Sequence, residues 1–151
     1  MEKKYKTQWV GQYAVASELI RRNNFVSMPL GNTPDLDLQC QNSYSKRKFS
    51  VQVKSLSSKT SFPIQNRLIK KEIPDLYFVF VHVPPEESEP LEYFVLNHEQ
   101  LLNVWKMGKK DIEERNKIRK KKGLKPIKEW SEGIHFKFLG GFRNNWDILP
   151  H

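Results

Sequence analysis

The segment SVQVKS, residues 50–55, decides how the rest of the chain is interpreted. Its alternation of apolar and polar residues predicts a β-strand with Phe49, Val51 and Val53 on one face. Gln52 and Lys54 then project from the other face, roughly 6.5 to 7 Å apart, because side chains along a strand alternate with a period of two. A strand that aims an amide and an amine into the same space suggests a functional site.

The segment before it, DLDLQCQ at residues 35–41, predicts a partner strand. Asp37 begins this strand and points away from its apolar face, which is formed by Leu36, Leu38 and Cys40. The polar, basic residues 42–48 predict a hairpin connection between the two strands. Antiparallel pairing would therefore bring Asp37 beside Gln52 and Lys54.

Residues 8–22 carry a helical pattern that ends at two asparagines. Its main apolar stripe recurs at spacings of three and four and consists of Trp9, Tyr13, Ala16 and Ile20. Glu18 lies on a second, narrow line of small residues at i, i+3 and i+7. Glu18 is either a functional carboxylate or a solvated helix residue paired with Arg22 one turn further on.

The composition indicates a single soluble, cytoplasmic domain of 151 residues. No segment has the ~18 to 20 continuous apolar residues of a membrane span, and the lysine-rich start leads into polar residues. The single cysteine, Cys40, excludes an intramolecular disulfide and is expected to be a small core residue. The net charge of +9 favours polyanionic partners, nucleic acid above all.

The second half of the chain predicts further strands at 76–83 and 91–96 and a helix that begins at Asn97 or His98 and runs through Trp105. His82 and His98 are expected to have structural roles. A basic helical arm is expected at about 106–128, where eleven Lys or Arg residues face three acidic residues. This arm is either a solvated face or a surface that lies along a phosphate backbone. Its candidate contact residues are Lys109, Lys110, Arg119, Lys120, Lys121 and Lys122.

The C-terminal part regains an apolar pattern. Residues 134–139 alternate as a short strand or extended piece, and Gly140-Gly141 breaks it. Phe142, Trp146 and Leu149 follow at helical spacing and are expected to close the core against the first half of the chain.

The order of these motifs resembles the PD-(D/E)XK nuclease superfamily, which includes many restriction endonucleases and archaeal Holliday junction resolvases. The resemblance covers roughly residues 8–83: a helix with a glutamate, Pro-Asp-x-Asp-apolar at a turn into a strand, and Val-Gln-Val-Lys-Ser about fifteen residues later. It implies an α/β (mixed α+β) fold, the three-layer restriction-endonuclease-like arrangement with a central mixed β-sheet flanked by helices.

Roles follow from the resemblance position by position. Asp37 corresponds to the metal-binding aspartate, with Asp35 as the rival because it directly follows Pro34. Lys54 is the lysine of the motif, and Glu18 matches the helix glutamate that some members add. Gln52 stands at the (D/E) position, a departure that lowers the negative charge of the metal site by one.

The implied chemistry is the hydrolysis of DNA by a metal-dependent endonuclease, with a homodimer expected by analogy. Mg²⁺ (or Mn²⁺) would be held by Asp37, Gln52 and Glu18, since this ion prefers oxygen ligands. Lys54 would orient or deprotonate the attacking water and offset the growing charge on the phosphate. Phosphates beside the site could receive hydrogen bonds from Ser55, Ser57, Ser58 and Lys59, unless this segment is an ordinary solvated loop.

Two other interpretations stay open. The glutamine at position 52 also fits a nucleic-acid-binding module that keeps the fold with little or no catalysis. If the resemblance is accidental, the basic charge would suit an RNA-binding or ribosome-associated protein.

Overall fold

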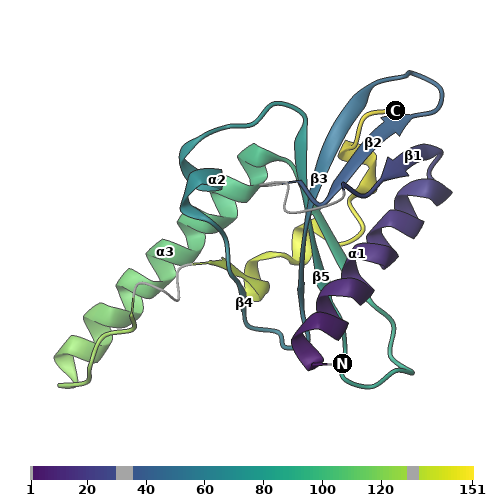
Figure 1. Ribbon diagram of the computed structural model, residues 1–151. Coiled ribbons are helices and arrows are strands. Elements are labelled where there is room, and N and C mark those ends of the chain that lie inside the picture. Colours follow the sequence, from purple (N-terminus) through teal and green to yellow (C-terminus); the bar gives the residue numbers. More distant parts are fainter. Residues whose placement is uncertain (1, 30–35, 129–132) are drawn as a thin grey trace.

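The computed structural model describes residues 2–29, 36–128 and 133–151, and it has a mixed α/β architecture (Figure 1). The helices are α1 (Lys3–Arg21), α2 (Asn66–Lys70) and α3 (His98–Lys121), with short 3₁₀ turns η2 (Phe136–Phe138), η3 (Gly140–Phe142) and η4 (Trp146–Ile148). The strands are β1 (Asn24–Ser27), β2 (Leu38–Asn42), β3 (Lys48–Leu56), β4 (Ser61–Phe62), β5 (Leu76–His82), β6 (Glu92–Leu96) and β7 (Ile134–His135).

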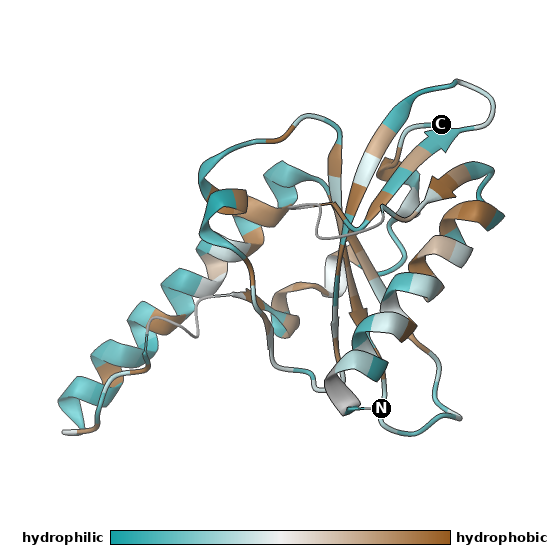
Figure 2. Ribbon diagram, viewed as in Figure 1, coloured by the Kyte–Doolittle hydropathy of each residue, from teal (hydrophilic) through white to brown (hydrophobic). Residues whose placement is uncertain are grey.

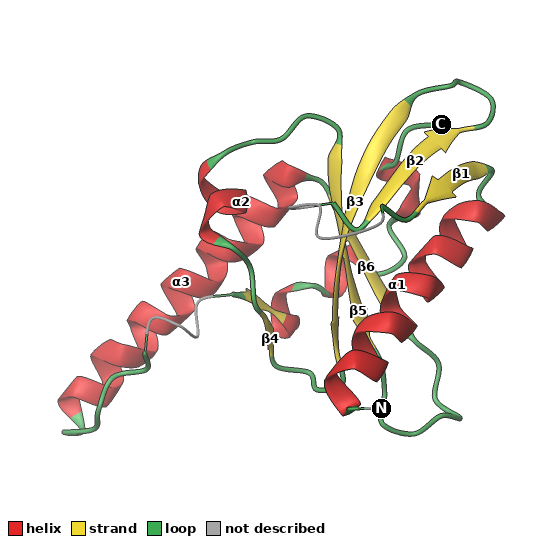
Figure 3. Cartoon of the chain, in the orientation of Figure 1, coloured by secondary structure: helices red, strands yellow, loops and turns green. Residues whose placement is uncertain are grey.

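Five strands form a mixed sheet in the order β1-β2-β3-β5-β6, with β3 at its centre. The first three strands form an antiparallel meander, β5 pairs parallel to β3, and β6 pairs antiparallel to β5. The expected fold class, a central mixed sheet flanked by helices, is confirmed, and so are the two strands that were predicted around the SVQVKS segment (Figure 3).

One face of the sheet packs against α1. Val15 and Leu19 of α1 are fully buried against the apolar side of β3, where Val51 is also inaccessible to solvent. Trp146 and Leu149, more than ninety residues further along the chain, complete this core. The prediction that these two C-terminal residues close the core against the first half is therefore confirmed.

The opposite face packs against α3. Phe78 and Phe80 of β5 lie with Leu101 and Val104 of α3 in a second core, which also takes in the small β4–β7 sheet. Phe142, expected to join the core with Trp146, packs at the edge of this second core instead. The sheet thus separates two apolar layers, and Figure 1 shows α1 and α3 on opposite sides of it.

The buried face of α1 differs from the expected stripe. Trp9, Tyr13 and Ile20 are 47%, 59% and 58% exposed, and only Ala16 of the stripe is buried. The packed face instead follows Gly11, Val15 and Leu19. Gly11 determines this choice, because a Cβ atom there would lie 1.8 Å from Oγ of Ser55, so only a glycine lets α1 approach β3 this closely.

The helix α3 joins the two predicted helical segments, the one through Trp105 and the basic arm after it, into one helix. It begins with a capping box between Asn97 and Gln100 and runs unbroken for 24 residues. Its last buried residue is Ile112, and beyond it the helix projects away from the sheet with a hydrophilic surface (Figures 1 and 2). The expected helical arm at 106–128 is correct only as far as Lys121. Gly123 has φ +68°, and the chain turns back there in a non-helical segment through residue 128.

Two short elements also depart from the sequence pattern. The five-residue helix α2 was not predicted, and only Leu68 within it is buried. The strand expected at 134–139 ends after His135, because the chain turns into the 3₁₀ helix η2. Within the described residues, no helix combines the length and the apolar character that crossing a membrane requires.

Candidate active site

Asp37 lies directly before β2 and reaches across to β3. Its Oδ2 atom accepts hydrogen bonds from Nε2 of Gln52 at 2.6 Å and from the backbone N–H of Val53 at 2.7 Å. The pairing of Leu38 with Val51 sets this contact, since it places Asp37 opposite Gln52 in an antiparallel register. Hydrogen bonds to a carboxylate are stronger than those to neutral acceptors, so they hold the Asp37 side chain in a fixed orientation.

Gln52 is buried at 6% exposure, and its side-chain amide is only half satisfied. Nε2 donates to Asp37, but Oε1 has no hydrogen-bond partner among the described residues. A buried polar atom without a partner costs about 1–3 kcal/mol, so such an atom in a folded protein requires an explanation. The orphaned Oε1 atom belongs to the residue that contacts Asp37, the expected metal-binding aspartate.

Lys54 follows two residues later on the same face of β3. Its side chain is half-buried and makes no hydrogen bond or ion pair with any part of the chain that the structure describes. The parallel register places Gln52 beside Phe78 and Lys54 beside Phe80, so both polar side chains leave the sheet on the side of the α3 core. The structure therefore brings Asp37 and Gln52 into contact and adds Lys54 on the same face.

The side chain that α1 contributes is Gln12, which the sequence analysis did not single out. Its Nε2 atom donates to the backbone carbonyl of Asp37 at 3.2 Å. The only sequence signal for Gln12 was its position, as a polar residue directly after Gly11 on a helix with a buried face. Gln12 fixes the position of the backbone that carries the Asp37 carboxylate.

Glu18, the helix glutamate that the resemblance suggested, does not join this group. Its carboxylate pairs with Arg21 at 2.9 Å and with Arg22, as the solvated-helix interpretation expects. Glu18 lies on the α1 side of the sheet near Tyr93, where its charge raises the pKa of that tyrosine after the larger effect of burial. Asp37 and Gln52 face the other way, so Glu18 is not positioned to share an ion with them.

The donor set suits a hard divalent ion bound through few protein ligands. Among the described residues there is no group of three His, Cys, Asp or Glu side chains that could hold a metal ion. Mg²⁺, however, needs only one or two carboxylates and otherwise keeps water or phosphate oxygens. The Asp37 carboxylate and the orphaned Oε1 of Gln52 fit such a minimal site. Asp35, the rival aspartate, lies outside the described residues.

The expected phosphate donors after β3 are dispersed. Ser55 faces α1 beneath Gly11, on the opposite side of the sheet from Lys54. Ser57 lines a hollow between α1 and the loop after β5, and Ser58 pairs with Thr60 at 3.0 Å. Lys59 forms an ion pair with Glu92 at 2.9 Å. These four residues do not converge on Lys54.

Glu92 is the centre of a second polar cluster that sequence reasoning missed. Besides Lys59, it contacts Arg143, and its Oε2 lies 2.8 Å from Nδ1 of His82. Burial lowers the pKa of His82, and the nearby Lys59 charge lowers it further. This cluster joins the ends of β5 and β6 to the C-terminal segment, so His82 has the structural surroundings that were expected of it. His98 likewise lies buried, 2.7 Å from the carbonyl of Leu68.

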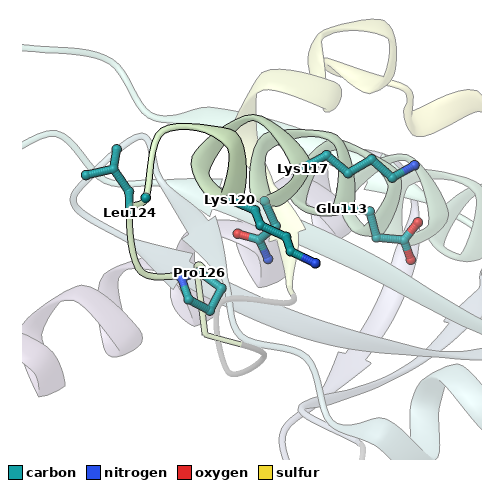
Figure 4. A pocket seen from close by; sticks show the side chains of 7 residues that line it. Glu113, Lys117, Lys120, Leu124 and Pro126 are labelled. Atoms are coloured by element: carbon teal, nitrogen blue, oxygen red, sulfur yellow. The ribbon is translucent and has the colours of Figure 1, made fainter.

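The candidate contact residues of the arm are separate from the site. Lys109 lies over the ring of Trp105, and Nε of Arg119 donates to the carbonyl of Lys125 at 2.6 Å. The returning segment is held to α3 by Asn116, whose side chain exchanges two hydrogen bonds with the backbone of Ile127. Between them lies an open cavity of about 650 Å³, where Glu113, Lys117 and Lys120 of the helix face Leu124 and Pro126 (Figure 4).

The face of the sheet beside the site is polar where β1, β2 and β3 meet. A shallow hollow of about 270 Å³ is lined there by Phe25, Ser27, Gln39, Gln41 and Lys48, among others. Gln39 pairs with Ser50, which lies two residues before Gln52 on the same face of β3. The site is therefore bordered by a shallow polar surface.

Comparison with known proteins gave no match: no protein-family model, curated protein or solved structure is significantly similar to this chain.

Proposed function

We propose that this protein is a metal-dependent DNA endonuclease with a PD-(D/E)XK-type site on its α/β fold, acting in the cytoplasm. The observation that carries the proposal is the contact between Asp37 and Gln52, with Lys54 on the same face of β3. The order of helix, antiparallel meander and parallel strand supports it, because this is the order that the resemblance implies. The basic composition supports it independently.

The reaction is hydrolysis: an oxygen of water forms a new bond to phosphorus, and one ester P–O bond breaks. A bound Mg²⁺ or Mn²⁺ supplies Lewis-acid activation of the phosphate and of water. Asp37 and the Oε1 atom of Gln52 would hold this ion, and hydrogen bonds from Val53 and Gln12 fix the position of Asp37. Lys54 orients the attacking water and offsets the charge that develops on the phosphate. The leaving oxygen takes its proton from solvent.

The test is the nicking of supercoiled and branched DNA in the presence of Mg²⁺ or Mn²⁺. Asp37→Asn and Lys54→Met should each lower nicking by at least about a hundredfold, the magnitude typical of a lost electrostatic contact at a reacting phosphate. Asp75→Asn and Lys71→Met are matched controls, because both residues are exposed at a turn and neither contacts the site. Absence of nicking by the wild type, or nicking that survives both site substitutions, would reject the proposal.

A second candidate is a nucleic-acid-binding module on the same fold with little catalysis. It is favoured by one observation: Gln52 leaves Asp37 as the only carboxylate that the described residues bring to the site. In that case duplex DNA binding would survive Asp37→Asn and Lys54→Met and would weaken steeply with salt. A large preference for structured RNA over DNA would instead indicate the RNA-binding interpretation.

A further inference from the structure

The face of the sheet that carries the candidate site continues across β2 and β1 in cross-strand rows. The strand pairing forms a first row of Phe25, Gln41 and Lys48 and a second row of Ser27, Gln39 and Ser50. The third row is the contact between Asp37 and Gln52. Successive rows on one face are two residues apart, so the first row lies roughly 13 to 14 Å from the candidate site.

The first two rows are largely open to solvent. The Phe25 ring is 65% exposed, and Ser27, Gln39 and Lys48 are exposed as well. Phe78 of β5, by contrast, is fully buried where α3 packs on this side of the sheet. The solvent-facing residues line the shallow hollow of about 270 Å³ beside the site. We use the name open sheet face for Phe25, Ser27, Gln39, Gln41 and Lys48.

The charge around the open sheet face favours a polyanion as its occupant. Residues 38–71 contain eight Lys or Arg residues and no Asp or Glu, although 17 acidic residues in 151 would give about four in a run of this length. Lys48 places one of these charges in the first row, at the hairpin end of β2 and β3, which Figure 2 shows as hydrophilic. The centres of protein–protein interfaces are depleted of charge, whereas a phosphate backbone attracts cations.

The shape and the chemistry of the open sheet face favour a single strand over a duplex. Adjacent strands are ~4.8 Å apart, so three of them span roughly 14 Å, too wide for the ~12 Å major groove. Unpaired bases, however, can stack on an aromatic ring and form hydrogen bonds with amide side chains along their edges. Phe25 offers the ring, and Gln39 and Gln41 offer the amides. Gln41 is held in place because its Nε2 donates to the carbonyl of Lys46 at 3.1 Å.

We propose that the open sheet face binds an unpaired stretch of DNA, with one base stacked on Phe25 and a phosphate against Lys48. At ~3.4 Å per stacked nucleotide, the first row lies about four nucleotides from Asp37. The substrate is then DNA that is unpaired within a few nucleotides of the bond that is cut. This assignment of the substrate rests on the proposed function, whereas the binding of the strand does not.

Fluorescence anisotropy with a labelled oligothymidine of about 12 nucleotides measures this binding, with a duplex of the same length for comparison. Phe25→Thr keeps a residue suited to a strand and should weaken binding of the oligothymidine by about five- to hundredfold, while duplex binding stays unchanged. Lys48→Gln should lower the salt slope by about 0.7, the value for one phosphate of a single strand. Tyr13→Ala is the matched control and should bind like the wild type, since Tyr13 is 59% exposed but lies on α1.

The nicking assay separates this binding from catalysis. Phe25→Thr should lower the nicking of DNA that has an unpaired arm and leave the nicking of fully paired DNA unchanged. A wild type that binds oligothymidine through Phe25 but nicks no DNA would reject the endonuclease and support the open sheet face. A wild type that nicks DNA, while Phe25→Thr binds oligothymidine as tightly as it does, would overturn the inference and leave the endonuclease intact.

Three further results would also contradict the inference. Phe25→Thr could weaken duplex binding as much as oligothymidine binding, which would mean that the face does not select unpaired DNA. Tighter binding of oligouridine than of oligothymidine would assign the face to RNA. A wild-type dimer that Phe25→Thr dissociates in sedimentation velocity would assign it to a second copy of the chain.

Discussion

At the scale of single residues, the orphaned Oε1 of Gln52 is the feature with the clearest chemical meaning. The neighbouring Nε2 donates to Asp37, so the amide cannot satisfy its own oxygen by rotating without giving up that bond. A carboxylate at this position would place two negative charges in contact and would require a cation. With glutamine at position 52, the site can fold without a bound cation.

This reasoning makes Gln52→Glu informative. Without a divalent ion the variant should be less stable than the wild type by about 1–3 kcal/mol, because a buried carboxylate at position 52 would be repelled by the half-buried Asp37 carboxylate that it contacts. Added Mg²⁺ should restore the loss, since a ligand that binds only the folded state stabilises it. Thermal unfolding with and without Mg²⁺ measures both effects. Gln8→Glu, at an exposed position on α1, is the control and should show no response to Mg²⁺; an equal response in both variants would count against a metal site at Asp37.

Cys40 gives a prediction about alkaline stability. Burial raises the pKa of its thiol from 9.0 to about 12, so the unfolded chain loses this proton at lower pH than the folded chain does. The contribution of Cys40 to stability is therefore complete below pH 9.0 and is lost as the pH rises toward about 12. Urea unfolding of the wild type and of Cys40→Val across this range should show a steeper fall for the wild type.

The comparison with Cys40→Val cancels the other groups that titrate in the same range. Tyr77 and Tyr93 also have raised pKa values, in both cases chiefly because of burial, and they are present in both proteins. Parallel stability curves for the two proteins would show that the Cys40 thiol does not take part.

At the scale of elements, α1 has two apolar faces, and packing selected the narrower one. The stripe with Trp9 and Tyr13 carries more apolar surface, but the face with Gly11 lets the helix backbone come close to β3. With this face turned inward, Val15 and Leu19 pack closely against the centre of the sheet.

The close approach predicts that Gly11→Ala is destabilising. In an isolated helix this substitution would stabilise, but here the new Cβ meets the Ser55 side chain, and overpacking of this kind costs about 1–3 kcal/mol. Urea denaturation measures the loss. Ser55→Gly in the same chain should recover most of it, and Gly141→Ala, which meets no atom within 4 Å, should leave stability nearly unchanged. A stabilised Gly11→Ala would show that α1 can shift on the sheet.

The elements differ in how far the sequence predicts them, for physical reasons. The strands β2 and β3 follow from the local alternation of apolar and polar residues, and β5 follows from a continuous apolar run, because a strand that is buried on both faces is apolar throughout. The buried side of α1 cannot be predicted in this way, since periodicity identifies an apolar stripe but does not show whether that stripe packs against the sheet. The five-residue helix α2 is stabilised by the burial of Leu68 rather than by its own sequence.

The candidate site was predictable in its main contact. Asp37 and Gln52 meet because the alternation of both strands puts them on the same face and the short connection at 43–47 pairs Leu38 with Val51, and the sequence indicates both features. Gln12 was not predictable, because the angle at which α1 crosses the sheet decides which helix residue reaches Asp37. The same angle sends Glu18 to the arginines of its own helix.

At the scale of the whole molecule, positive charge is concentrated in the arm. Residues 106–128 hold eleven of the 26 Lys and Arg residues and only three of the 17 acidic ones, so the remainder of the chain is close to neutral. The arm projects beyond Ile112 by the nine residues to Lys121, about 14 Å of helix at 1.5 Å per residue. The arm is therefore the part of the chain where positive charge would attract a polyanion most strongly.

Substitutions in the arm should therefore change the salt dependence of DNA binding. Replacing Lys120, Lys121 and Lys122 with Gln should reduce the slope of log affinity against log salt by up to about 2.7, because each lost phosphate contact removes about 0.9. Fluorescence anisotropy with duplex DNA measures this slope. Lys46→Gln, Lys70→Gln and Lys71→Gln together remove the same charge from other exposed positions, and an equal effect there would argue against a specific role of the arm.

The placement of Trp146 and Leu149 has a consequence for the synthesis of the protein. Both lie in the core beneath α1, beside residues made more than a hundred positions earlier in the chain, and Asn42 also donates to the carbonyl of Pro150. The ribosome adds about 5–20 residues per second, so the N-terminal half waits seconds for the residues that complete its core. We expect chains stalled before residue 146 to be digested rapidly by protease, and chains that extend through residue 151 to resist. Resistance of the stalled chains would mean that the first half folds without this closure.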